Sequence, residues 1–374
     1  MSTKGLEDVV AAQTSISDID GKLGRLFYVG YDIHDLAPNA TFEEVVFLLH
    51  NLRLPTQSEL DSLTKTLAED REISEWIRNL LPTLAEKSVP MSMLRTTVSA
   101  MSAHDPDGSS MDDEANLRKS IRLIARIPTV IANYHRLRNG NEVIPPNLDL
   151  SLAADFLYRL TGEEPKPDHA RIFDMCLVLH ADHTMNASTF TARVIASTLA
   201  DMHSAITGAI ASLKGPLHGG ANEQVMGMLE DIEGDAKRAP EYIKRRLAVR
   251  EKIMGFGHRV YKTEDPRATW LRKMSKQLAE ETGEGRWFEA SRAIEQTVME
   301  EKGLYPNVDF YAASVYRYLG IPTDLFTPIF AASRASGWTA HVREQQRDNR
   351  IIRPESEYTG PRNRTWQPID QRTA

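Results

Sequence analysis

Cysteine is almost absent from this sequence, with Cys176 alone among 374 residues. A framework of internal disulfides is therefore excluded, and we expect a protein of the reducing cytoplasm. An excess of positive charge is also missing, because 45 Lys and Arg stand against 52 Asp and Glu, for a net charge of −7. No general basic field attracts nucleic acid, so any anionic ligand must be held by local groups of basic side chains.

Long apolar runs are scarce as well. The best candidate for a membrane span, residues 194–213, contains Asp201 and His203, so we predict a buried helix there. The first ten residues, MSTKGLEDVV, have no apolar centre and resemble neither a secretory signal nor an arginine-rich transit peptide. We therefore expect no association with a membrane.

Helical patterns fill the chain after a short β-prone start. Residues 14–31 are predicted to form a hairpin, because Asp20-Gly21 supplies a turn and residues 26–29 are β-prone. No long strand pattern follows, so we predict an almost all-α protein with a small N-terminal β-hairpin. Helices are expected after the capping boxes Thr41-x-x-Glu44 and Thr56-x-x-Glu59, at 91–101, 121–137 and 194–213, and after Asn222 and Asn307 as caps.

His218 lies in the unusual segment GPLHGGAN, residues 215–222. Gly215 and Pro216 end the preceding helix, and the glycines that follow allow another group to approach the backbone closely. A histidine that only fills a core does not need this setting. We expect the ring of His218 to face a ligand.

A second histidine, His258, lies in the glycine-containing segment GFGHRVYKTEDPR, residues 255–267. Arg259, Lys262 and Arg267 follow it closely, and backbone N–H groups beside guanidinium groups suit a phosphate or carboxylate. The third glycine of a dinucleotide-binding fingerprint is missing. The alternative interpretation is a charged surface loop.

His180 and His183 are spaced to share one face of a helix. A zinc pair is one interpretation, but two ligands do not complete a zinc site. His180 ends an apolar run and is alternatively a core residue. We favour a role for one of the two histidines as a hydrogen-bond donor to an anionic ligand.

Acidic and basic candidates follow near the end of the chain. Asp309 is expected in the first turn of a helix, where it either complements the helix dipole or acts as a general base. Arg334 lies in an apolar stretch and Arg353 ends another, and each forms either a structural ion pair or, with Arg267, part of a cage for a dicarboxylate. These residue types indicate proton abstraction next to a carbonyl group of a small polyanion.

Four segments, in this order, resemble the citrate synthase family: HADH at 180–183, GPLHGGAN at 215–222, GFGHRVYKTEDPR at 255–267 and PNVD at 306–309. The resemblance implies a two-domain helical fold with a large domain of residues 1–218 plus 327–374. A small domain, residues 219–326, would close over the site. It also implies condensation of acetyl-CoA with oxaloacetate to citrate, without a metal or other cofactor.

The resemblance further implies a role for each motif residue. Asp309 would remove a methyl proton of acetyl-CoA, His218 would hydrogen-bond the thioester oxygen, and His258 would polarise the ketone of oxaloacetate. In the family, the equivalent of Arg353 comes from a second subunit, so a homodimer is implied. The oxaloacetate carboxylates would be held by His183, Arg267, Arg334 and Arg353, and the CoA phosphates by Lys262 and Arg259.

Two alternatives remain open at this stage. A 2-methylcitrate synthase would use propionyl-CoA, and one additional methylene changes discrimination by only about 1–3 kcal/mol. A non-catalytic helical module that binds CoA or another anion would need Asp309 and His218 only for packing.

Overall fold

The computed structural model describes residues 4–6 and 9–372. Strands β1 (Ser17–Asp20), β2 (Arg25–Tyr28) and β3 (Tyr31–Asp32) form an antiparallel sheet in the order β1-β2-β3. Ser17 pairs with Tyr28, and Tyr28 pairs with Tyr31. The predicted hairpin is confirmed, and the two-residue third strand is an addition to it.

Sixteen α-helices make up most of the described chain, which confirms the all-α prediction. The helices are α1 (Ile33–Asn39), α2 (Phe42–Asn51), α3 (Gln57–Glu69), α4 (Glu75–Lys87), α5 (Pro90–Met101), α6 (Asp113–Arg138), α7 (Leu152–Thr161), α8 (Pro167–His180), α9 (Ala187–Ser197), α10 (Met202–Leu213), α11 (Ala221–Asp231), α12 (Ala239–Ala248), α13 (Pro266–Thr282), α14 (Arg286–Lys302), α15 (Val308–Tyr318) and α16 (Phe326–Arg347). Short 3₁₀ turns lie at Lys4–Leu6, Ser102–His104, Ala236–Arg238, Thr323–Leu325 and Ile369–Gln371.

Two local predictions about helix boundaries are wrong. Residues 194–213 form parts of two helices, α9 and α10, because Leu199 adopts a left-handed conformation with φ 63°. Asp201 is the N-cap of α10, where its side chain accepts a hydrogen bond from the backbone N–H of Ser204. Asn222 is not a cap either, because α11 begins one residue earlier, at Ala221.

The capping predictions at two other helices are confirmed. The Thr41 side chain accepts from the backbone N–H of Glu44, and the Glu44 carboxylate accepts from the backbone N–H of Thr41, at the start of α2. The Asn307 side chain accepts from the backbone N–H of Asp309. Asp309 therefore lies in the first turn of α15, as the sequence predicts.

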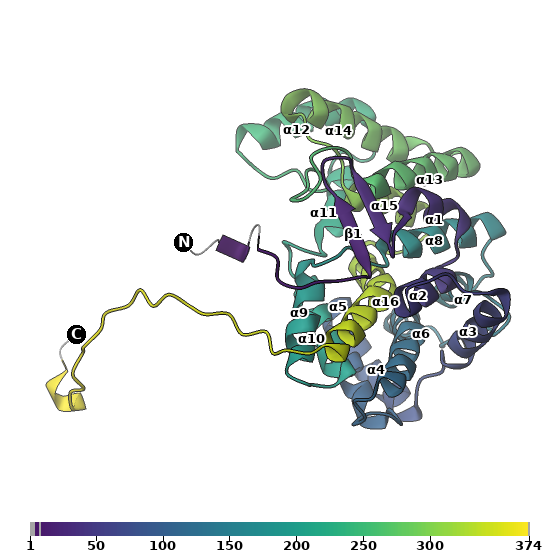
Figure 1. Ribbon diagram of the computed structural model, residues 1–374. Helices are drawn as coiled ribbons and strands as arrows, with labels where there is room; N and C mark the ends of the chain where they lie inside the picture. The colour runs from purple at the N-terminus through teal and green to yellow at the C-terminus, as the bar shows by residue number, and fades with distance from the viewer. Residues whose placement is uncertain (1–3, 7–8, 373–374) are drawn as a thin grey trace.

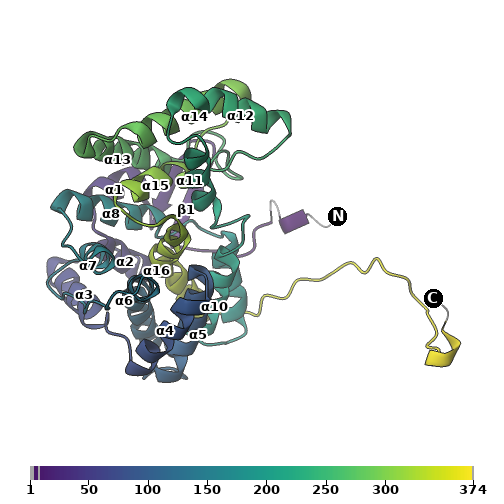
Figure 2. The same cartoon turned by 180° about the vertical axis from the view of Figure 1, so that it is seen from behind.

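Helix α16 lies at the centre of the molecule. Figures 1 and 2 show α11–α15 gathered at one end and α2–α7 toward the other, with α16 between them. Nearly every side chain of α16 is buried, including Arg334 and Arg343. A helix that is buried all round belongs to the core of a large domain. The proposed domain boundaries after residues 218 and 326 stay a prediction.

The chain after α16 follows a different course. Residues 349–352 still contact α9, where the backbone N–H of Ile352 donates to the Ser197 hydroxyl at 3.0 Å, and the chain beyond them extends away from the body of the molecule (Figures 1 and 2). The apolar side chains of Ile351, Tyr358, Trp366 and Ile369 are exposed along this tail. Within residues 4–6 and 9–372, the helices are too short or too polar to cross a lipid bilayer.

Candidate active site

A cavity of about 990 Å³ contains seven of the nine side chains to which the family resemblance assigns a role. Lys262 and Arg353 do not line it, and both are exposed. The ammonium group of Lys262 contacts the carbonyl of Arg259, and Arg353 lies on the C-terminal tail. The seven residues that line the cavity are His183, His218, His258, Arg259, Arg267, Asp309 and Arg334.

Backbone hydrogen bonds join the His258 segment to the Asp309 segment. The N–H of Asn307 donates to the carbonyl of Gly255 at 2.8 Å, and the N–H of Gly257 donates to the carbonyl of Tyr305 at 2.9 Å. The Asn307 side chain also donates to the carbonyl of Gly257 at 3.0 Å. Gly255 is required here, because its φ is +80° and a Cβ atom would lie 2.7 Å from a methyl group of Val225. The two motifs therefore form one unit.

The hydrogen bonds of His258 define its tautomer. Its Nδ1 accepts from the backbone N–H groups of Val260 at 3.0 Å and Tyr261 at 3.2 Å. Burial, with a further effect of Arg267, lowers the pKa of His258 to about 4. The ring is therefore neutral at pH 7 with its proton on Nε2, and it can donate a hydrogen bond to a carbonyl oxygen in the cavity.

His218 has the opposite tautomer. Its Nε2 accepts from the backbone N–H of Ser188 at 3.3 Å and contacts the Ser188 hydroxyl at 2.9 Å. Trp338 donates to the same hydroxyl from its indole nitrogen at 3.1 Å. Burial, and then the charge of Arg334, lower the pKa of His218 to about 4. The neutral ring therefore carries its proton on Nδ1.

Asp309 lies in the cavity wall with a carboxylate of unusual basicity. Burial raises its pKa to about 7, although the charges of Arg267 and Arg334 act in the opposite direction. A general base works best when its pKa is close to the pH at which it operates. Asp309 is thus suited to accept a proton, with two neutral imidazole donors in the same cavity.

Arg267 already has an acidic partner inside the protein. Its guanidinium group donates to Asp265 from Nε at 3.0 Å and from a terminal nitrogen at 2.8 Å, and both residues are buried. Asp265 also accepts from the backbone N–H of Val308 at 3.2 Å, at the start of α15. This ion pair fixes Arg267 next to the helix that carries Asp309. Asp265 is not among the residues that the sequence predicts for the site.

Arg334 has no such partner within the described part of the chain. It is 1% exposed, its Nε donates to the carbonyl of His180 at 2.7 Å, and its guanidinium group lies 4.6 Å from the centre of the Phe330 ring. Burial lowers its pKa to about 10. A buried cation without an acidic neighbour in a cavity wall is the strongest indication of an anion-binding position.

His180 contributes to the core. Its Nδ1 lies 2.7 Å from the carbonyl of Cys176, its ring packs edge-on against Phe330, and burial lowers its pKa to about 3. The described residues include no group of three His, Cys, Asp or Glu side chains that would hold a metal ion. The arrangement agrees with the interpretation of His180 as a core residue.

A second cavity, of about 680 Å³, adjoins the first at His218 and Asp309. Lys252 lines both cavities and is not among the residues that the sequence predicts for the site. Arg246 and Lys302 also line the second cavity, where Arg246 is paired with Glu251, and much of the remaining wall is apolar. A long ligand with anionic groups therefore has room to extend from the acid–base residues. The apolar wall includes Leu247, Ile253, Met254, Phe256, Val298 and Leu304.

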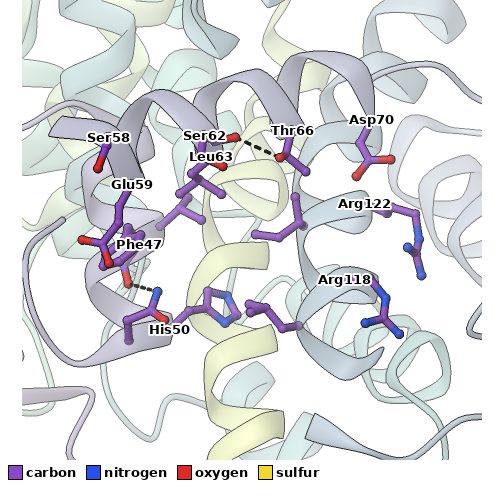
Figure 3. A pocket seen from close by; sticks show the side chains of 14 residues that line it. Phe47, His50, Ser58, Glu59, Ser62, Leu63, Thr66, Asp70, Arg118 and Arg122 are labelled. Carbon is purple, nitrogen blue, oxygen red and sulfur yellow. Dashed lines mark hydrogen bonds between the residues drawn. The ribbon is translucent and has the colours of Figure 1, made fainter. Parts of the chain in front are cut away.

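A third cavity, of about 470 Å³, lies among α2, α3 and α6 (Figure 3). None of the residues singled out from the sequence lines it. Its histidine, His50, is engaged at both ring nitrogens, by Thr339 at 3.1 Å and by Arg343 at 3.0 Å. Its arginines, Arg118 and Arg122, are paired with Asp107. Its acidic side chains are Glu59, which is paired with Arg53, and Asp70, which lies 3.7 Å from Arg126.

Comparison with known proteins identifies the family of this chain. The family model for the citrate synthase C-terminal domain matches residues 5–355. The chain is 52% identical to citrate synthase 2 of Bacillus subtilis over 99% of both chains. It is 41% identical to a 2-methylcitrate synthase of Shewanella oneidensis over 98% of this chain and 97% of that one.

A solved structure gives the same result for the fold. The citrate synthase of Thermoplasma acidophilum, in a ternary complex with carboxymethyl coenzyme A and oxaloacetate, superimposes with a TM-score of 0.94. It is 33% identical, and the likeness covers 100% of both chains. With the family match over nearly the whole length, these similarities show that the chain belongs to the citrate synthase family.

Proposed function

We propose that this protein condenses acetyl-CoA with oxaloacetate and water to give citrate and CoA. One observation carries the proposal: a single cavity holds a carboxylate with a pKa near 7, two neutral imidazole donors and an unpaired buried guanidinium group. This set matches the needs of an enolisation followed by attack on a ketone. Because the chain belongs to a family of enzymes, we favour this function over that of a non-catalytic module that binds CoA or another anion.

The reaction begins with a proton transfer. Asp309 takes a proton from the methyl group of acetyl-CoA, while His218 donates a hydrogen bond from Nδ1 to the thioester oxygen, on which charge develops. His258 donates from Nε2 to the ketone oxygen of oxaloacetate, so that the new carbon–carbon bond forms and the resulting alkoxide is protonated. Water then cleaves the thioester of the citryl-CoA intermediate and releases CoA.

The substrate contacts follow from the charges in the two cavities. Arg334, Arg267 and His183 hold the carboxylates of oxaloacetate. CoA extends into the adjoining cavity, which has positive charge and a long apolar wall. The Thermoplasma citrate synthase binds carboxymethyl coenzyme A and oxaloacetate in its complex, which supports acetyl-CoA and oxaloacetate as the substrates of this protein. The CoA phosphates meet cations around this path, namely Arg246, Lys252, Arg259, Lys262 and Lys302.

Closure of the small domain, residues 219–326, over the large one completes the site. The cavity wall includes Arg334 and His183 from the large domain and His258 and Asp309 from the small one, so closure brings the two sets together and excludes water. The chemistry needs no metal or other cofactor beyond the two substrates. We place the enzyme in the cytoplasm.

The test measures free thiol released as CoA, with oxaloacetate and either acetyl-CoA or propionyl-CoA at matched concentrations. We expect a higher kcat/KM with acetyl-CoA. A higher value with propionyl-CoA would keep the mechanism and change the product to 2-methylcitrate. Absence of thiol release with both donors would contradict the proposed function.

The working enzyme is a homodimer in which the C-terminal tail of each subunit serves the other subunit. Arg353 does not line the cavity of its own chain, and it lies at the start of an extended tail with exposed apolar side chains. Such a tail is stabilised when a second subunit covers its apolar surface. Arg353 would then reach an oxaloacetate carboxylate across the interface.

Mixing two inactive variants tests this arrangement. Arg353→Ala and Asp309→Asn subunits, produced together, form mixed dimers in which one of the two sites has both native residues. Random pairing makes half of the dimers mixed, so activity should recover to about a quarter of the wild-type value. If each chain supplies its own Arg353, the mixture will be no more active than the two variants measured separately.

A further inference from the structure

Tyr261 forms a hydrogen bond with His183 across the candidate active site. The phenol oxygen lies 3.2 Å from Nε2 of His183, and the two ring centres are 5.7 Å apart. Both side chains are buried, at 4% and 8% exposure. Tyr261 belongs to the segment 255–267 and His183 to the segment 180–183, so this contact joins two of the four motifs directly.

Both partners of this hydrogen bond are neutral, so its direction depends on which nitrogen of His183 carries the proton. Burial raises the pKa of Tyr261, so the phenol keeps its proton. Burial, followed by the charge of Arg267, holds the pKa of His183 well below its ordinary value, so the imidazole is neutral. A neutral imidazole has one donor and one acceptor nitrogen. When Tyr261 donates to Nε2, the proton of His183 is on Nδ1.

Nδ1 of His183 is the atom that faces the substrate space. This atom has no hydrogen-bond partner within the described residues, and it is not fully buried. The ring of His183 lines the cavity. Arg267 and Arg334 line the same cavity and make it favourable for an anion. A carboxylate placed there accepts hydrogen bonds only, so the histidine must present an N–H group.

The N-terminal hairpin holds the two loops at this separation. At one end, the Ser17 hydroxyl donates to Asp182, which directly precedes His183. At the other end, the carbonyl of Gly21 accepts from the backbone N–H of Lys262 at 2.8 Å. A Cβ atom at Gly21 would lie 2.3 Å from the carbonyl oxygen of Val260, so the turn packs directly against the backbone beside Tyr261.

We propose that Tyr261 is a positioning residue: its hydroxyl fixes His183 as the Nδ1–H tautomer and thereby prepares it to bind a carboxylate of oxaloacetate. This inference rests on the proposed function of the site. Without the hydroxyl, both tautomers of His183 are accessible, and the one with its proton on Nε2 turns a lone pair toward the anion.

The test replaces Tyr261 with phenylalanine, which keeps the ring and removes the donor. The KM for oxaloacetate should rise about tenfold, because one oriented hydrogen bond to a charged group is lost. The KM for acetyl-CoA and kcat should change less than about twofold, because the residues that act on acetyl-CoA keep their own partners. The ¹⁵N shifts of labelled histidine should show His183 protonated on Nδ1 in the wild type and in mixed tautomers in Y261F.

Tyr318→Phe is the matched control. Its hydroxyl donates to the carbonyl of Glu284 at 2.7 Å and accepts from the N–H of Phe288 at 3.1 Å, and it does not line the cavity. Loss of that hydroxyl should lower Tm without changing the KM for oxaloacetate. An unchanged KM in Y261F, or an unchanged His183 tautomer, would contradict the inference while the wild type still releases CoA. An inactive wild type would instead contradict the proposed function.

Discussion

Replacement of Asp309 with asparagine will lower the rate of condensation by about a thousandfold or more, while oxaloacetate binding stays within about twofold of the wild type. Asparagine keeps the size of the side chain and its place in α15, but it cannot accept the methyl proton. Exchange of the methyl protons of acetyl-CoA with deuterated solvent should disappear together with thiol release. If exchange survives in this variant, Asp309 is not the base.

The same replacement will stabilise the protein at alkaline pH. Because burial raises the pKa of Asp309 to about 7, the folded state holds this proton more tightly than the unfolded state. The tighter binding of this proton stabilises the folded wild type. This stabilisation is complete below about pH 4 and is lost as the pH rises through about 7. A raise of about three pKa units corresponds to about 4 kcal/mol, and partial solvation of the carboxylate reduces this to about 2 kcal/mol.

Thermal unfolding at two pH values measures this effect. The Tm of the Asp309→Asn variant should exceed that of the wild type clearly at pH 8 and only slightly at pH 4. For the same reason, kcat/KM of the wild type should fall as the pH drops below about 7, where the base becomes protonated. Equal Tm differences at the two pH values would show that Asp309 has an ordinary pKa.

Replacement of Arg334 with leucine will weaken the binding of oxaloacetate by about a hundredfold or more. Arg334 is buried without an acidic partner in the described chain, so its charge is left for the substrate carboxylate. Titration calorimetry with oxaloacetate measures the change in Kd. The free energy of unfolding should fall little, because the variant loses one hydrogen bond to the carbonyl of His180 and no internal ion pair.

Arg159→Leu provides the control for a buried arginine of structural character. Its guanidinium group donates to Thr129 at 2.7 Å and to Asn133 at 3.0 Å, and it lies 3.6 Å from Asp155. Its loss should lower stability by about 3 kcal/mol, because it removes these buried hydrogen bonds and leaves Arg71 as the remaining arginine beside Asp155. The affinity for oxaloacetate should stay unchanged. If Arg334→Leu behaves like this control, Arg334 has a structural role.

Local sequence was sufficient for much of the candidate site. His218 and His258 were identified because glycine and proline beside them indicate bends, and bends depend on adjacent residues. Asp309 was placed in the first turn of its helix because Asn307 is a strong capping residue. The break between α9 and α10 was missed because no glycine or proline marks it and Leu199 takes the left-handed conformation instead.

Only the tertiary structure decided which nitrogen of each histidine carries the proton and which arginine has an acidic partner. Ser188 fixes the tautomer of His218 from another helix, and Asp265 pairs with Arg267 while Arg334 is left without an acidic partner. The Asp265–Arg267 pair is local in sequence, but its burial, the contact of Ser188 with His218 and the lack of an acidic partner for Arg334 depend on packing between distant segments. By itself, the sequence determined the helices, the bends and the residue types of the site. Packing around α16 and the hairpin determined their protonation, their pairing and the cavity into which they face.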